Sequence, residues 1–205
     1  MTKTKDNNTE VEILDAAKNV FQQKGMDGAR MQEIADEAGI NKAMLHYYYR
    51  SKQLLFEAVF KNVFSLLAPQ LNAILNDESS IEEKIINFTN NYISFIIKHP
   101  YLPNFIIHEL NRNPDFILNI QKNNGFPNIK KFKKQVEYEV EKGTIAAISG
   151  EQLFINILSL NIFPFVAKPL VKGFLNLDDP SFKQLMNERK IEVSNFIINS
   201  IKVHP

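Results

Sequence analysis

The chain has 205 residues, of which 44% are hydrophobic and 23% charged, and its formal net charge is only +1. This composition is typical of a folded protein with one large or two small domains, and the near-neutral charge gives no whole-chain sign of nucleic-acid binding. The absence of cysteine excludes disulfides and thiolate metal sites and agrees with a reducing cytosol. The polar residues 1–10 lack the apolar core of a signal peptide.

The first predicted helix has clear signals at both ends. Thr9 is followed by Glu12 at capping-box spacing, so we expect the helix to open at Thr9. The apolar residues between Ile13 and Phe21 recur at helical spacing. Gly25 can adopt a positive φ and is therefore expected to end this helix.

Three further helices follow in close succession. The second is predicted from about Arg30 to Ala38 and ends at Gly39, because a sharp turn needs a residue without a Cβ. Asn41 is expected to cap the third helix and Ser51 the fourth. The fourth keeps one apolar face to about Asn76, so it is predicted to be long.

The rest of the chain is also predicted to be helical, and the fold class is therefore all-α. The expected helices are Ser80 to Lys98, Tyr101 to Asn111, Pro114 to Lys122, Pro127 to Lys142, Gly150 to Lys168 and a last helix opened by Pro180. The most apolar stretch, Leu153 to Val171, contains polar residues and two prolines. We interpret it as a buried or dimer-forming helix and expect no membrane partner.

The segment from Met31 to Lys52 has the geometry of a helix-turn-helix, with two short helices on either side of a glycine turn. From Ala38 through Phe56 there is no Asp or Glu, but there are two lysines, an arginine, a histidine and three tyrosines. A surface that meets phosphates excludes carboxylates, which would repel the DNA backbone. The second helix of the motif is therefore predicted to enter the major groove of DNA. A surface helix that lacks acids by chance is the alternative.

These residues resemble the tetracycline-repressor family of bacterial regulators. The similar features are the helix from Ile13 to Phe21, Gly25, Ile34-Ala35, Ala38-Gly39-Ile40, Lys42, Leu45, the run His46 to Tyr49, Ser51-Lys52, Leu55 and Phe56. The resemblance covers about residues 11–60. It implies a homodimer that represses transcription until a small molecule binds. The implied domains are a three-helix DNA-binding domain at 8–54 and a larger helical ligand-binding and dimerisation domain at 55–205.

The resemblance also implies which residues meet DNA. The candidates are Arg30, Gln32, Lys42, Ala43, Met44, His46, Tyr47 and Lys52. Lys42, Ala43 and Met44 fall where the family reads bases. His46 and Tyr47 occupy positions where the family contacts the DNA backbone, and Lys52 occupies the position of the family's phosphate-binding lysine. His46 replaces the usual tyrosine, which makes that contact either pH-sensitive or absent. Arg30 stands near the start of the second helix, where the usual side-chain cap is missing, and is expected to reach a phosphate instead.

The candidate pocket for an unidentified small-molecule effector is less sharply defined. Its residues are Tyr92, Phe95, Phe105, His108, Asn156 and Ser159. The aromatic residues are alternatively core, and the two polar residues of the apolar helix could instead meet across a two-fold axis. His108 and Glu109 point about 100° apart on a helix and do not form a metal or acid–base pair. We expect no cofactor, no metal and no catalytic site.

The expected partners are double-stranded operator DNA and a second copy of the chain, paired through the last two long helices. The expected location is the bacterial cytoplasm, associated with the nucleoid. Two alternatives remain open at this stage. One is a protein-interaction module that presents the helix-turn-helix to a protein, and the other is a small-ligand carrier whose DNA-binding motif is vestigial.

Overall fold

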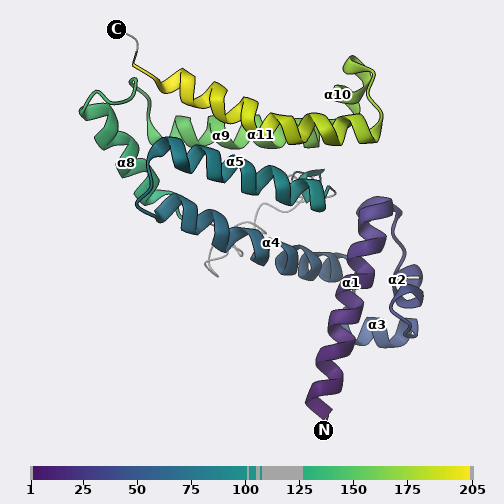
Figure 1. Cartoon of the computed structure of the whole chain (residues 1–205). Helices are drawn as coiled ribbons and strands as arrows, with labels where there is room; N and C mark the ends of the chain where they lie inside the picture. The colour runs from purple at the N-terminus through teal and green to yellow at the C-terminus, as the bar shows by residue number, and fades with distance from the viewer. Residues whose placement is uncertain (1, 101, 105–106, 108–126, 204–205) are drawn as a thin grey trace.

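The computed structural model describes residues 2–100, 102–104, 107 and 127–203, and the part it describes contains helices and no strand (Figure 1). The helices are α1 (Thr2–Gly28), α2 (Met31–Glu37), α3 (Lys42–Tyr48), α4 (Lys52–Asn76), α5 (Ile81–Lys98), α8 (Lys130–Glu141), α9 (Gly150–Val166), α10 (Lys168–Leu175) and α11 (Asp179–Ile201). The all-α fold class is thus confirmed. The helices expected at Tyr101 to Asn111 and Pro114 to Lys122 lie largely outside the described residues.

The first helix begins earlier than the sequence indicated. α1 starts at Thr2, so the prediction that it opens at Thr9 is wrong. A capping box marks the first residue of a helix only where the preceding chain is not helical. Here the polar residues before Thr9 are themselves part of the helix. At the other end, Gly25 has φ +67° and ψ 177° and kinks the helix, but α1 continues to Gly28, so the prediction that Gly25 ends it holds only for the regular part.

A tight turn at Gly39 joins α2 to α3. The N–H of Ile40 donates to the carbonyl of Ala35 at 3.0 Å, which is the closure of a Schellman motif. Gly39 has φ +67°, a left-handed conformation in which a Cβ would be strained. The Asn41 side chain then accepts a hydrogen bond from the N–H of Met44 at 2.8 Å. The predicted turn and the predicted cap are both confirmed.

The fourth helix connects the two ends of the molecule (Figure 1). Ser51 Oγ accepts from the N–H of Leu54 at 3.1 Å, as its predicted capping role requires. The first half of α4 packs on α1, where the rings of Phe21 and Phe56 lie 4.5 Å apart, and the second half packs on α5. By length and composition α4 could cross a membrane, but its apolar face is covered by these two helices.

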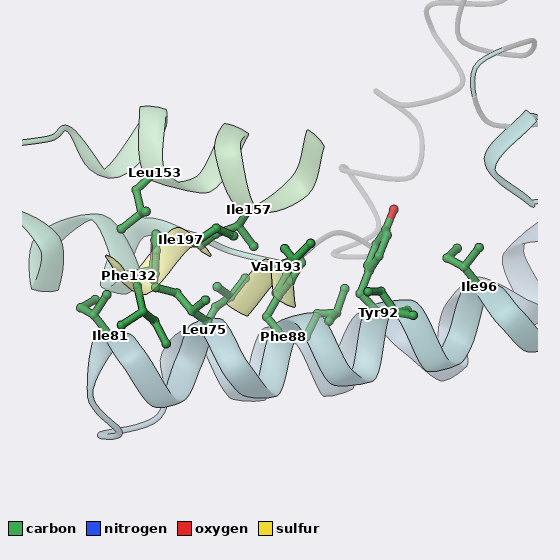
Figure 2. Packing of buried hydrophobic residues seen from close by; sticks show 14 of the residues in the cluster. Leu75, Ile81, Phe88, Tyr92, Ile96, Phe132, Leu153, Ile157, Val193 and Ile197 are labelled. Carbon is green, nitrogen blue, oxygen red and sulfur yellow. The ribbon is translucent and has the colours of Figure 1, made fainter. Parts of the chain in front are cut away.

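The larger core is formed by α4, α5, α8, α9 and α11 (Figure 2). Its central side chains include Ile85, Phe88, Phe132, Leu153, Ile157 and Ile197, each at most 2% exposed. Burial of one such side chain contributes roughly 1.5–3 kcal/mol relative to leaving it in water. Phe95 packs against this core and also against the N-terminal one, so it links the two.

The apolar helix ends sooner than expected. α9 stops at Val166 rather than at Lys168, and α10 continues at an angle of 73°. Pro164 lacks an N–H, so the carbonyl four residues earlier, that of Leu160, has no partner within α9. Arg189 of α11 donates to this carbonyl from Nη2 at 3.0 Å and from Nε at 3.3 Å. The proline therefore creates an acceptor that fixes α11 to α9.

A buried lysine stabilises the start of α5. Lys84 has a fully buried side chain, and its Nζ donates to Asp77 Oδ1 and to the Asp77 carbonyl, both at 2.8 Å. The hydrogen bond from Lys84, followed by that from Ser79, lowers the pKa of Asp77 from 3.8 to about 2. Because the folded pKa is depressed, this contribution to stability is present above pH 4 and is lost as the pH falls through about 2.

We therefore expect Asp77→Asn to lower stability at neutral pH by about 1–2 kcal/mol, since Lys84 stays buried while the carboxylate is partly exposed. Between about pH 4 and pH 2 the melting temperature of the variant should fall less steeply than that of the wild type. Circular dichroism melts across this range test the prediction. Asp15→Asn, which removes an exposed carboxylate on α1, is the matched control. Equal slopes in the two variants would contradict the assignment.

Candidate nucleic-acid interface

The third helix is fixed on one side and exposed on the other. Leu45 is completely buried in the N-terminal core, whereas Lys42, Ala43, His46 and Tyr47 are exposed. Residues three and four positions apart share a helix face, so these four side chains form one outward surface. Tyr47 is 83% exposed, which is unusual for an aromatic side chain without a partner to cover it.

Of the three consecutive tyrosines, Tyr48 and Tyr49 make contacts within the protein. Tyr49 is buried, and its hydroxyl donates to Glu10 Oε1 at 3.0 Å, so it ties the end of α3 to α1. Burial, together with the bond to Glu10, raises the pKa of Tyr49. Tyr48 meets the ring of Tyr47 edge-on at 5.6 Å. Only Tyr47 of this run is therefore well placed for an external contact.

The start of α2 presents Arg30 to solvent. Arg30 is the N-cap residue with extended backbone, and its N–H donates to Glu33 Oε2 at 3.4 Å. Glu33 in turn pairs with Lys24 Nζ at 3.1 Å. The hydrogen bond from Lys24 is the main cause that lowers the pKa of Glu33. The exposed Arg30 side chain gives no cap to the helix and is available for an outside partner.

Two other DNA candidates have local partners. Gln32 Nε2 donates to Asp36 Oδ1 at 2.8 Å, within the same helix. Lys52 Nζ donates to the carbonyl of Ala29 at 3.0 Å and to that of Asp27 at 3.3 Å. Lys52 lies 23 and 25 residues after these two carbonyls, so no local pattern in the sequence indicated the contacts. Met44, the remaining candidate, lies at the tip of α3 and is 37% exposed.

The candidate pocket residues are not brought together among the described residues. Tyr92 is buried, with its ring stacked on Phe88 at 5.6 Å, and Phe95 is half-buried. Asn156 and Ser159 are exposed on the outer side of α9. Phe105 and His108, the other two candidates, have side chains outside the described part of the chain.

The buried polar residue of α9 is Asn161. Its Nδ2 donates to the Ile157 carbonyl at 2.7 Å and to Thr89 Oγ1 at 3.2 Å. Among the residues that the structure describes, no three His, Asp or Glu side chains are grouped closely enough to hold a metal ion. A surface cavity of about 180 Å³ lies between the end of α5 and the start of α11, and none of the pocket candidates lines it.

Residues 13–59 match the family described as bacterial regulatory proteins, tetR family. The HTH-type transcriptional regulator RutR of Escherichia coli (strain K12) is 38% identical over 65 residues, which cover 32% of this chain and 31% of RutR. The match therefore spans about a third of that relative. The probable HTH-type transcriptional regulator YttP of Bacillus subtilis is 22% identical over 188 residues, covering 89% of this chain and 91% of YttP.

Among solved structures, the transcriptional regulator FadR from Bacillus subtilis, in complex with stearoyl-CoA, is similar in fold with a TM-score of 0.65. The alignment covers 95% of this chain and 99% of FadR at 16% identity. At this identity the likeness concerns the fold. It extends beyond the helix-turn-helix to nearly the whole chain.

Proposed function

Because the chain belongs to the tetR family of bacterial regulatory proteins, we propose that it is a sequence-specific DNA-binding transcriptional regulator, a repressor that a small-molecule ligand releases. The outward face of α3 is the observation that carries this proposal, since it gathers a cation and an exposed tyrosine in a stretch without carboxylates. In this role the chain has no catalytic activity. The protein acts in the bacterial cytoplasm at the nucleoid, with residues 8–54 on DNA.

Direct contacts to DNA are divided between bases and phosphates. Lys42 lies in the first turn of α3, the end of a recognition helix that meets base edges. Ala43 and Met44 offer apolar contacts that suit the methyl group of thymine. Tyr47 and His46 face the same way and donate to phosphate oxygens. Ala43 and Met44 distinguish few bases, because they offer only apolar contacts. Base discrimination therefore rests on Lys42 and on DNA shape.

The second copy of the chain binds to the outer face of α9 and α11. Phe163 of α9 and Phe196 of α11 are 57% and 64% exposed, and Ile155 of α9 is 53% exposed. Large apolar side chains gathered on adjacent helices mark an interaction surface. Ser159 lies one turn from both Ile155 and Phe163, so its exposure fits a place on the two-fold interface. The Arg189 bond to α9 holds the two helices of this face together.

The effector belongs to the helical domain at residues 55–205. The fold likeness to FadR, whose structure contains stearoyl-CoA, supports a small molecule with a long acyl chain as its class. Tyr92 and Phe95 are the described candidates, and Phe95 contacts both cores. A ligand that displaces Phe95 would alter the tilt of α4 and hence the spacing of the two recognition helices. It could shift this equilibrium only by its differential affinity for the two states.

Fluorescence anisotropy with a labelled duplex of mixed sequence tests the DNA-binding proposal. The logarithm of the affinity should fall linearly with the logarithm of the salt concentration, with a slope of about −0.9 for each phosphate contact. Absent binding would contradict the proposal and favour a protein-interaction module or a ligand carrier. Binding that does not depend on salt would contradict it as well.

A further inference from the structure

Lys52 begins α4, yet its ammonium group is directed at the chain before α2. It donates to the carbonyls of Asp27 and Ala29 at 3.3 and 3.0 Å. Asp27 lies in the last turn of α1, where the helix no longer supplies partners for its C=O groups, and Ala29 follows directly after the helix. Ala29 is only 2% exposed, and a buried carbonyl without a partner would be costly. Lys52 therefore satisfies the open end of α1.

The residue that follows these carbonyls is Arg30. Its backbone is held on the other side by the bond from its N–H to Glu33, which Lys24 fixes in turn. Arg30 thus lies between two anchored points, with its side chain exposed. In a helix-turn-helix the first helix of the motif crosses the DNA backbone, so its N-cap lies near phosphates.

We propose that Lys52 is a positioning residue for DNA binding, which holds the turn from Asp27 to Ala29 so that Arg30 meets a phosphate. This inference rests on the proposed function. It differs from the role that the family resemblance implies, in which Lys52 itself contacts the phosphate. Two of the three ammonium hydrogens are already given to protein carbonyls.

Thermal melts of the free protein give the first test. Lys52→Met keeps the apolar stem and removes the donors, and it should lower the melting temperature by roughly 3–6 °C without any DNA present. Lys52→Arg should restore most of this loss, because a guanidinium can donate to two carbonyls. Lys61→Met removes an exposed lysine from the same helix and should leave the melting temperature unchanged. An unchanged melting temperature for Lys52→Met would overturn the proposal.

A double-mutant cycle with Arg30→Ala gives the second test, using anisotropy with the same mixed-sequence duplex. Each single variant should bind roughly tenfold more weakly and lose about one unit of salt slope. The double variant should lose no more than Arg30→Ala alone, because Lys52 acts through Arg30. Additive losses, with about two units of slope lost, would show a separate phosphate contact and overturn the positioning role. If the wild type binds no duplex, the proposed function fails and the positioning role fails with it. This holds even if the melts show that the bonds from Lys52 to the Asp27 and Ala29 carbonyls stabilise the protein.

Discussion

Lys42→Glu should weaken binding to duplex DNA by roughly 100-fold at low salt, because the substitution removes a cation at the tip of α3 and adds repulsion from the phosphates. Tyr47→Ala should cause a smaller loss that is equal for all sequences, since a phosphate contact carries no base information. Lys42→Ala should also relax base preference. Fluorescence anisotropy at several salt concentrations measures all three effects.

A charge-matched control separates local contact from net charge. Lys61 is exposed on α4, away from the helix-turn-helix, and Lys61→Glu makes the same change in charge. We expect its effect on affinity to be within about threefold, because exposed charges beyond a Debye length are largely screened. Equal losses for Lys42→Glu and Lys61→Glu would show that binding responds only to total charge and would contradict the assigned surface.

Phe196→Asp should dissociate the dimer, with its dissociation constant raised roughly 1,000-fold. The substitution places a carboxylate on the apolar face of α11, and in a symmetric dimer it occurs twice. DNA affinity should fall together with dimerisation, because a monomer reaches only one half-site. Light scattering at micromolar protein concentration measures the mass, and anisotropy measures the loss of DNA binding.

The control for this variant is Leu66→Asp. Leu66 is 57% exposed on α4, close to the 64% of Phe196, but it lies outside the proposed interface. The Leu66 variant should remain dimeric. A dimeric Phe196→Asp, or a Leu66→Asp that dissociates, would move the interface away from α9 and α11.

Local signals in the sequence predicted the structure of the helix-turn-helix well. The caps at Asn41 and Ser51 and the turn at Gly39 depend on residues within four positions of one another, so their chemistry can be read from the order of residues. The wrong helix start predicted at Thr9 has the same origin. A capping pattern does not reveal whether the chain before it also remains helical.

Contacts between distant residues could not be predicted in this way. Lys52 matches a phosphate-binding position in sequence, but its partners are carbonyls more than 20 residues away. In α9 the sequence favoured Asn156 and Ser159 as polar pocket residues and left Asn161 out. The fold buries Asn161 and exposes Asn156 and Ser159, because the packing of α5 and α11 decides which side of the helix is covered.

We propose that a dimer of this chain reads a two-fold-symmetric DNA site through α3. Selection of bound duplexes from a random-sequence pool by the wild-type protein tests it most directly. We predict enrichment of an inverted repeat whose half-site centres lie about 34 Å apart, or a multiple of this distance. The Lys42→Glu variant should enrich no such repeat. Recovery of no common sequence by the wild type, or of one without two-fold symmetry, would contradict the account.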